Sequence, residues 1–530
     1  MGFSRSGTPP PGVQVYDTAG FRRDGTLTKA TPTEGFPLCA TLAAPGPERA
    51  LALAETAKAG GAGLVEYRLD AFEQPPGEIE RGLSSLVERS PLPAIVTFRL
   101  PEDGGLREID EAARIAILLA ALRTDVAWVD VERGREEALA DAAKGRLVVS
   151  HHDYDGTPAD LAQVAREIES GPADVVKLAV TAKSSADSFA CYEVIRAARK
   201  PTVAFAMGKL GSASRVVALA LGSPWTYAML DEEVAPGQLP LARLVGEFRV
   251  GRLKATSALY GVIGRPVGHS MSPAMLNAAF DITGTDAVYL PFEVDADPAG
   301  FVRRMAGFGA AGFSVTIPHK VDVMAAIDEV VPAARRIGAV NTVAVRGGRL
   351  LGTNTDLYGA MDSIASAAGG VDALSGKRAV VLGAGGAARA IVFGLVEAGM
   401  EVTLTDIDPA RAADLASVSG AEAVEATSAG ETVGEFDVVA NATPVGMHPK
   451  EDACPVDTSL LREGQIVFDA VYNPLETRLV KEAAARGCRT VRGIEMFVRQ
   501  GARQFELWTG APAPAGVVDA MRNTVLERLG

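Results

Sequence analysis

The chain has 530 residues, more than one hydrophobic core usually organises, so two to four domains are expected. Hydrophobic residues make up 48% of it and charged residues 22%, the balance of an ordinary globular protein. A formal net charge of −14 argues against a nucleic-acid partner and against charge-driven binding to an anionic membrane. The four cysteines are far apart and form no C-x-x-C pair, so no metal centre is predicted.

Residues 1–36 are rich in Gly, Pro, Ser and Thr and contain no apolar signal core. They are predicted to form a disordered tail. The longest apolar stretch, residues 115–122, is too short to span a bilayer. These features together predict a soluble, cytoplasmic protein.

Residues 37–253 alternate between short apolar runs rich in β-branched residues and segments with helical periodicity. Eight such strand–helix units predict an α/β fold of the TIM-barrel type, a (β/α)8 barrel. The expected helices include residues 48–59, 110–123 and 158–169. The expected strands are residues 38–42, 64–69, 94–98, 126–132, 147–150, 174–180, 202–207 and 225–230.

Lys177 interrupts an apolar strand, which would place its amine in the desolvated interior of the barrel. Burial disfavours the charged form, so a neutral amine able to attack a carbonyl is predicted. His152, near the end of a neighbouring strand, can move the protons that imine chemistry requires. Arg68, Arg99 and Arg215 are candidates to clamp a substrate carboxylate, which guanidinium binds bidentately. A salt-bridged lysine, a turn-capping histidine and surface ion pairs are the alternatives.

This half resembles type I 3-dehydroquinate dehydratases over residues 37–250. The resemblance is carried by Leu64-Val-Glu-Tyr-Arg-Leu-Asp70, Thr97-Phe-Arg99, Ser150-His-His-Asp153, Lys177, Met207-Gly-Lys-Leu-Gly-Ser-Ala-Ser-Arg215 and Ala235-Pro-Gly-Gln238. It implies that Lys177 forms an imine with the substrate ketone and that His152 moves the proton for water elimination. It also implies that the substrate is bound by Glu66, Arg68, Arg99, Arg215 and Gln238, and that no metal is needed.

Two positions depart from this family. Asp103 stands where members usually have Glu, and the resemblance implies that this carboxylate orients the catalytic histidine. Val234 stands where members usually have Ser, which removes a hydrogen-bond partner for the substrate at a typical cost of about 0.5–1.5 kcal/mol. We therefore expect a slower or more weakly binding dehydratase rather than an inactive one.

A substrate domain is predicted for residues 256–360, after a linker at 254–256 and beginning with a strand at 258–264. Ser270 and Ser272 follow that strand, where their hydroxyls suit a polyol or carboxylate. Ser272 is also predicted to cap a helix that starts at Pro273, and capping alone is the alternative.

Two charged residues of this domain are expected at adjacent strand ends. Lys320 follows an apolar strand, and Asp356 follows a hairpin that turns at residues 346–349. They form a candidate proton-transfer pair, with a structural salt bridge as the alternative.

Residues 361–492 are predicted to form a Rossmann domain. The run Gly383-Ala-Gly-Gly-Ala-Ala388 follows an apolar strand and matches G-x-G-x-x-A, with a helix to about residue 398 and a strand at 401–405 behind it. The pyrophosphate of a dinucleotide is expected at the N-terminus of that helix. Asp406 is expected to accept hydrogen bonds from the adenosine ribose.

Residues 256–530 resemble shikimate dehydrogenases. The matching stretches are His269-Ser-Met-Ser-Pro273, Val315-Thr-Ile-Pro-His-Lys320, Ala339-Val-Asn-Thr342, Asn354-Thr-Asp356, the glycine loop, Asn441-Ala-Thr-Pro-Val-Gly-Met447, Asp469-Ala-Val-Tyr-Asn-Pro474 and Gln500-Gly-Ala-Arg-Gln504. The resemblance implies that Lys320 and Asp356 are the catalytic pair and that helices in 493–530 pack back on the substrate domain. The implied substrate-binding residues are Ser270, Ser272, Thr316, Asn341, Tyr472, Gln500 and Gln504. The implied cofactor-binding residues are Gly383, Ala384, Gly385, Gly386, Ala387, Asp406, Thr443, Gly446 and Met447.

The cofactor is expected to be NAD or NADP, and Asp406 favours NAD. Many members have Asn-Arg-Thr where this chain has Asp406-Ile407-Asp408, and a carboxylate there repels a 2′-phosphate. Arg411 is close enough in sequence to offset that repulsion. A further departure is Leu276-Asn277, where the family usually has His-Asn.

Together the two resemblances imply a bifunctional enzyme that dehydrates 3-dehydroquinate to 3-dehydroshikimate and reduces the product to shikimate. One alternative is an NAD-linked dehydrogenase that oxidises quinate or shikimate, with a weak or inactive barrel. The other is a non-catalytic sensor of these compounds. Lys177, His152, Lys320 and Asp356 are all present, which favours an enzyme.

Overall fold

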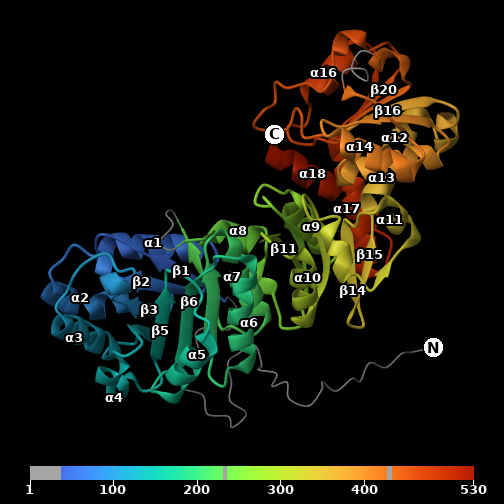
Figure 1. The fold of residues 1–530 in the computed structure, drawn as a ribbon. Coiled ribbons are helices and arrows are strands. Elements are labelled where there is room, and N and C mark those ends of the chain that lie inside the picture. Colours follow the sequence, from blue (N-terminus) through green and yellow to red (C-terminus); the bar gives the residue numbers. More distant parts are fainter. Residues whose placement is uncertain (1–36, 231–235, 427–431, 530) are drawn as a thin grey trace, which may run out of the picture. The chain divides into compact units, whose positions relative to one another are not determined.

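The computed structural model describes residues 37–230, 236–426 and 432–529 (Figure 1). The chain divides between Ser257 and Ala258 into two compact units, next to the predicted linker. The expected tail, residues 1–36, and Val234 lie outside the described residues.

The first unit has the strand order of a (β/α)8 barrel, as predicted. Each strand from β1 to β6 pairs in parallel with the strand that follows it, and β1 also pairs with β8; no β7–β8 ladder is present in the part of the chain that is described. The strands are β1 (Leu38–Leu42), β2 (Leu64–Arg68), β3 (Ala94–Thr97), β4 (Trp128–Glu132), β5 (Leu147–Asp153), β6 (Val175–Thr181), β7 (Thr202–Met207), β8 (Thr226–Met229) and β9 (Leu239–Pro240). The helices are α1 (Pro47–Ala59), α2 (Pro76–Glu88), α3 (Glu111–Leu122), α4 (Ala140–Ala143), α5 (Leu161–Ser170), α6 (Ser188–Ala197), α7 (Ser214–Ala220) and α8 (Leu241–Gly246).

The barrel strands are buried along nearly their whole length, because helices cover their outer side and side chains fill the interior, and in β2 and β4 the buried side chains include charged ones. Strand β5 differs most from its prediction, since it continues past Ser150 and pairs His152 with Ala179 of β6. His152 therefore stands on the strand itself, which fixes the direction of its side chain more firmly than a loop would.

The second unit begins with a mixed sheet of the order β11-β10-β12-β14-β15-β13. The hairpin turns between Arg346 and Arg349, as the sequence predicts. The strands are β10 (Ala258–Gly264), β11 (Ala287–Glu293), β12 (Ala310–Val315), β13 (Glu329–Val330), β14 (Thr342–Arg346) and β15 (Arg349–Thr353). The helices are α9 (Ser272–Ile282), α10 (Pro298–Gly307), α11 (Pro332–Ile337) and α12 (Thr355–Ala368).

A parallel sheet of the order β18-β17-β16-β19-β20-β21 follows, which is the 3-2-1-4-5-6 order of a Rossmann fold. Its strands are β16 (Arg378–Leu382), β17 (Glu401–Thr405), β18 (Glu422–Ala423), β19 (Val438–Asn441), β20 (Ile466–Asp469) and β21 (Arg489–Val491). Its helices are α13 (Gly386–Glu397), α14 (Pro409–Ser419) and α16 (Arg478–Ala485). The predicted Rossmann arrangement is confirmed.

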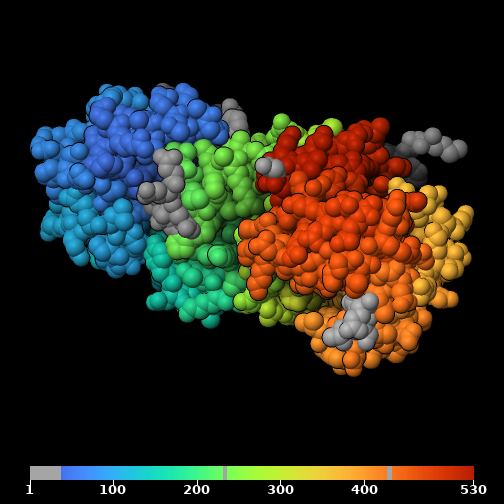
Figure 2. All heavy atoms as spheres, turned by 90° about the horizontal axis from the view of Figure 1, so that it is seen from above, coloured from blue at the N-terminus to red at the C-terminus, as the bar shows by residue number. Residues whose placement is uncertain are grey.

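The last helices, α17 (Gly493–Thr509) and α18 (Val517–Leu529), return to the sheet that opens the second unit. Phe505 and Met521 share one core with Tyr260, Phe280 and Tyr289 of that sheet and its helix α9. Both helices also contribute to the surface of the second unit (red in Figure 2). Among the described residues, no helix combines the length and apolarity needed to cross a membrane.

The prediction that Ser272 caps helix α9 is wrong. The helix begins at Ser272 itself, and the Ser270 hydroxyl accepts the Ser272 backbone N–H at 3.2 Å. A residue already inside the helix cannot turn its side chain back to the first free amides. The Ser272 hydroxyl is instead hydrogen-bonded to Tyr289.

Asn277 closes the edge of this first sheet of the second unit. Its amide accepts the Tyr289 N–H at 2.9 Å and donates to the Tyr289 carbonyl at 2.8 Å, both in edge strand β11. Asn277→Ala leaves two buried backbone groups without partners, so we expect the free energy of unfolding of the second unit to fall by about 2–4 kcal/mol. Denaturant unfolding measures the loss. Asn523→Ala, an exposed site on α18, is the control and should stay within about 0.5 kcal/mol of wild type; an equal loss in both variants would contradict the edge argument.

Candidate active sites

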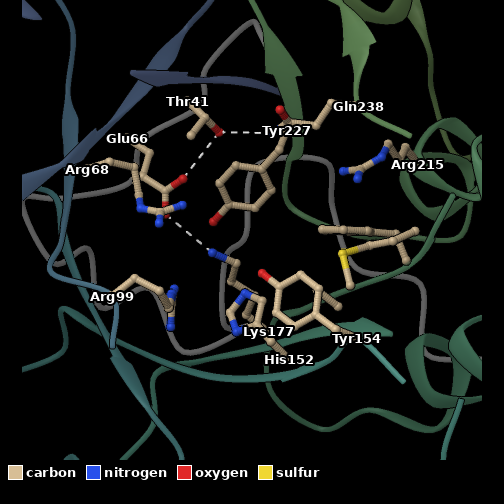
Figure 3. Close-up of a pocket in the computed structure, with 13 residues that line it drawn as sticks. Thr41, Glu66, Arg68, Arg99, His152, Tyr154, Lys177, Arg215, Tyr227 and Gln238 are labelled. Carbon is tan, nitrogen blue, oxygen red and sulfur yellow. Dashed lines mark hydrogen bonds and ion pairs between the residues drawn. The ribbon is translucent and has the colours of Figure 1, made fainter. Parts of the chain in front are cut away.

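A pocket opens at the carboxyl ends of the barrel strands (Figure 3). It collects all of the residues predicted for this half except Asp103. The lining residues are Thr41, Glu66, Arg68, Arg99, His152, Tyr154, Lys177, Ala179, Phe205, Met207, Arg215, Tyr227 and Gln238. Strands β1, β2, β5, β6, β7 and β8 therefore contribute side chains to one cavity, where barrel enzymes carry their chemistry.

Lys177 is buried at the centre of this pocket, as predicted. Its Nζ lies 2.7 Å from Oδ2 of Asp130 and 3.4 Å from Oε1 of Glu66 (Figure 3 draws the second contact). The face of the Tyr227 ring lies 4.4 Å away. The amine is thus an ion pair inside the barrel, so a proton must leave it before it attacks a carbonyl.

Asp130, in the middle of β4, is the residue that the sequence interpretation missed. Its Oδ1 accepts hydrogen bonds from Arg99 at 2.8 Å and from Ser150 at 2.7 Å, while Oδ2 binds Lys177. Burial by itself would raise the pKa of Asp130, but Arg99 and Lys177 outweigh it and lower that pKa to about 2. A usable signal existed, because Asp130 interrupts an apolar strand in the same way as Lys177.

Arg99 is surrounded by carboxylates. Besides Asp130 it contacts Glu132 at 3.2 Å, and Glu132 in turn lies 2.6 Å from the buried Arg114. Arg114 reaches Glu111 at the barrel surface. Arg99 thus belongs to an alternating chain of buried charges, and any contact with a substrate has to be made in addition to these bonds.

Arg68 and Arg215 have different surroundings. Arg68 makes a bidentate pair with Asp70, at 2.9 and 2.7 Å. Arg215 donates to the backbone carbonyls of Pro236 and Gly237, and its guanidinium lies 4.1 Å from the centre of the Phe205 ring. Its side chain also lines the pocket, beside Phe205 and Gln238.

His152 is held as a neutral imidazole. Burial, and then the positive charges of Arg99, Lys177 and Arg68, lower the pKa of His152 well below its ordinary 6.5. Its ring stacks on Tyr154 with the centroids 6.4 Å apart. A neutral imidazole beside a buried lysine is suited to accept a proton.

The expected contact between Asp103 and His152 is absent from the described structure. Nδ1 of His152 is buried and has no hydrogen-bond partner there. Asp103 lies on a 3-10 turn, and its backbone carbonyl accepts the Tyr154 hydroxyl at 3.2 Å. Burial and nearby Glu132 raise the pKa of Asp103.

The second unit brings Lys320 and Asp356 together, as predicted. Lys320 Nζ lies 2.5 Å from Asp356 Oδ2, and Asn341 donates to Asp356 Oδ1 at 2.8 Å. Lys320 follows β12 and Asp356 begins α12, so the pair joins a strand end to a helix N-terminus. Asn341 fixes the carboxylate and leaves one oxygen for the lysine.

Hydroxyls and amides surround this pair in one hydrogen-bonded chain. Gln504 binds Ser314 at 2.8 Å and Thr342 at 3.0 Å, and Gln500 meets Thr355 at 3.4 Å. Tyr472 stacks on Phe497 of α17, with the centroids 4.3 Å apart. Ser314, Thr342 and Thr355 were missed, although the last two lie inside the quoted motifs. The remaining predicted residues, Ser270, Ser272 and Thr316, lie at the start of α9 and after β12.

The glycine loop between β16 and α13 adjoins the lysine. A Cβ on Gly386 would lie 2.8 Å from Cδ of Lys320, so the lysine side chain runs against the loop. Gly383 has φ +107°, which favours glycine, and a Cβ there would meet Ala442 and Thr443 of the loop after β19. This cradle of bare backbone at a helix N-terminus fits a dinucleotide pyrophosphate.

Asp406 is engaged by the protein itself. It accepts the Ala384 N–H at 2.7 Å and the Asp408 N–H at 2.9 Å, and Arg411 lies 3.9 Å away. The Arg411 guanidinium also lies 3.6 Å from where a Gly385 Cβ would be. Thr443 binds Asn441, and Gly446 and Met447 follow in the same loop.

Comparison with known proteins matches each half to a family. Residues 38–250 match type I 3-dehydroquinase, 262–343 the shikimate dehydrogenase substrate binding domain and 493–526 the shikimate 5′-dehydrogenase C-terminal domain. The chloroplastic bifunctional 3-dehydroquinate dehydratase/shikimate dehydrogenase of Arabidopsis thaliana is 37% identical over 87% of this chain and 80% of its own. Shikimate dehydrogenase (NADP(+)) of Bacillus mycoides is 42% identical over 51% and 99%. The solved dehydroquinate dehydratase and shikimate dehydrogenase from S. pombe AroM is 29% identical over 93% and 99%, with a TM-score of 0.42.

The chain therefore joins a barrel of the lyase class to an oxidoreductase with a Rossmann fold. It belongs to the family of bifunctional 3-dehydroquinate dehydratase/shikimate dehydrogenases. Both resemblances drawn from the sequence are confirmed.

The contact between Gly386 and Lys320 is open to a direct test. Gly386→Ala places a methyl 2.8 Å from Cδ of Lys320, so the lysine side chain that pairs with Asp356 must shift. We expect the dehydrogenase kcat to fall by about tenfold or more, with the dehydratase rate unchanged, because small misplacements of a reacting group are costly. Gly307→Ala is the matched control, since a Cβ there meets nothing within 4 Å. Steady-state kinetics of both reactions measure these effects. A dehydrogenase kcat that Gly386→Ala leaves unchanged would show that the close packing of Lys320 on Gly386 does not matter for reduction.

Proposed function

We propose that the barrel dehydrates 3-dehydroquinate through an imine on Lys177 and that the second unit reduces 3-dehydroshikimate to shikimate. The observation that carries the first half is a buried lysine beside a neutral histidine in one pocket. For the second half it is the Lys320–Asp356 pair against the glycine loop. We also propose that the functional division follows residues 37–253, 256–360 with 493–530, and 361–492.

In the proposed dehydration, the Lys177 amine attacks the ketone carbon, and the carbonyl oxygen leaves as water. The protonated imine then withdraws electrons from the neighbouring C–H bond. His152 takes that proton as a neutral base, which its depressed pKa supports. The substrate hydroxyl leaves with a proton that His152 returns, and hydrolysis of the imine releases the product.

The substrate carboxylate is proposed to bind Arg215. Support comes from the place of its guanidinium in the pocket lining, against the Phe205 ring. Arg68, Glu66 and Gln238 are proposed to hold the hydroxyls around the ring. Arg99 is proposed to contribute mainly through Asp130 and Glu132, which already share its charge.

In the proposed reduction, Lys320 donates a proton to the carbonyl oxygen of the substrate. A nicotinamide dinucleotide, when bound, supplies the hydride. Asp356 holds the ammonium in place, while Asn341, Gln500 and Gln504 offer polar groups to the substrate hydroxyls and carboxylate. Ser270, Ser272, Thr316 and Tyr472 are proposed to complete that side, and Gly446 and Met447 to border the nicotinamide.

We propose that this chain prefers NAD. The carboxylate of Asp406 lies where the adenosine ribose is expected, and a free diol suits it better than a phosphate. The neighbouring Arg411 offsets part of the repulsion, so some use of NADP is expected. The Bacillus mycoides relative carries NADP(+) in its name, which makes this preference a feature to be measured for this chain.

A coupled assay tests both halves. The full chain is given 3-dehydroquinate, or 3-dehydroshikimate as a control, and oxidation of NADH and NADPH is followed in parallel. We expect turnover from both substrates, faster with NADH. Lys177→Met should abolish turnover from 3-dehydroquinate and leave turnover from 3-dehydroshikimate unchanged. Arg411→Ala should lower the rate with NADPH more than the rate with NADH. Turnover from 3-dehydroshikimate only would show an inactive barrel, and a preference for NADPH would refute the role of Asp406.

The pH dependence of dehydration tests the base. The pKa of His152 is shifted downward from 6.5, so its neutral form persists to lower pH than that of an exposed histidine. Imine formation has its own proton requirement at Lys177, so the base is read in the later step: in single-turnover measurements on the imine, we expect the rate of proton abstraction to remain level as the pH falls through 6.5 and to decline only well below it. A half-maximal loss centred at pH 6.5 would contradict the neutral, buried base.

A further inference from the structure

Lys177 has two carboxylate contacts among the described residues, and Asp130 is the one that lies outside the pocket. It is buried in the middle of β4 and does not line the cavity, whereas Glu66 does. Its Oδ2 lies 2.7 Å from the Lys177 nitrogen, against 3.4 Å for the nearer oxygen of Glu66. Glu66 is therefore open to a ligand in the pocket, whereas the contact between Asp130 and Lys177 lies behind the lining residues.

The orientation of the Asp130 carboxylate is fixed from the opposite side. Oδ1 accepts from Arg99 at 2.8 Å and from Ser150 at 2.7 Å, so the group cannot turn without breaking both bonds. The pKa direction agrees with a carboxylate that stays ionised throughout. Glu66 is held differently, by the neutral hydroxyls of Thr41 and Thr97.

We propose that Asp130 is the fixed counter-ion of the Lys177 nitrogen during dehydration, pairing first with the ammonium and then with the protonated imine. This inference rests on the proposed imine. The overall step converts an ammonium and a ketone into a protonated imine and water: the carbon–oxygen bond breaks, a carbon–nitrogen double bond forms, and two N–H protons leave with the oxygen. The positive charge on nitrogen is the same before and after, so one fixed anion serves both states.

Loss of the negative charge of Asp130 should slow dehydration. Without the anion, the protonated imine is a cation facing Arg99, and the electron-withdrawing form of the intermediate becomes rarer. Electrostatic contacts of this kind typically change rates by about 10²-fold or more. Substrate binding should change little with a substitution that keeps the shape of Asp130, because Asp130 does not line the pocket and Arg99 keeps its second carboxylate, Glu132.

The test uses two substitutions with opposite properties in the full chain. Asp130→Asn keeps the shape and removes the charge, while Asp130→Glu keeps the charge and changes the length. We expect dehydratase kcat to rank wild type first, Glu second and Asn last, with Asn lower by about 10²-fold. Borohydride trapping with 3-dehydroquinate, read as adduct mass on Lys177, should fall in the same order.

Binding of quinate, which has a hydroxyl in place of the ketone, separates charge from packing. Calorimetry should give the Asn variant a Kd within about threefold of wild type, because no imine forms with this ligand. Loss of quinate binding together with activity, or an Asn variant that outperforms the Glu variant, would overturn the counter-ion in favour of a packing role. Absence of a trapped adduct in the wild type would instead refute the proposed imine itself, and with it this inference.

Discussion

Two opposite charges, Lys177 and Asp130, lie 2.7 Å apart in the interior of the barrel, where removing each of them from water costs several kcal/mol. The cost is met by a chain of alternating charges that runs through Arg99, Glu132 and Arg114 towards the surface. Removing a single member would leave its neighbour uncompensated, a loss of typically about 3–5 kcal/mol. The positions of these side chains are therefore set by electrostatic pairing as much as by packing, and the pocket inherits that rigidity.

The state of the histidine follows from the same arrangement. The cations that balance the buried carboxylates face His152 as well, and together with burial they keep its imidazole neutral. The second unit holds its lysine with fewer charges. Among the described residues Lys320 pairs with one carboxylate, Asp356, and the neutral Asn341 orients that carboxylate. One lysine is thus embedded among several charges, which suits covalent chemistry on nitrogen, while the other remains partly exposed, which suits proton donation to a substrate oxygen.

Most of the fold and much of both sites were predictable, because the signals are local. The period of the strands, the polar residues at their ends and the glycine loop are written in short stretches of sequence. Asp130 interrupts an apolar strand, which marks it as unusual in the sequence, but its pairing with Lys177 joins β4 to β6 and is visible only in the folded barrel. The expected contact between Asp103 and His152 also depended on more than local sequence, since Asp103 lies in a 3-10 turn between a strand and a helix. The predicted start of α9 differs from the observed start, Ser272, by a single residue, because sequence patterns locate helix ends only to within one or two residues.

Asp406 shows why cofactor preference is hard to infer from a residue type alone. Its carboxylate accepts the Ala384 amide, so it helps to shape the glycine loop as well as the ribose site. An arginine at this position would bind a phosphate but would remove the acceptor that holds the turn. Arg411 places a positive charge beside the loop while Asp406 keeps its contact with the Ala384 amide. It lies 3.9 Å from Asp406 and next to Gly385. The choice between the two dinucleotides is thus coupled to the conformation of the loop, and a single substitution at residue 406 changes both.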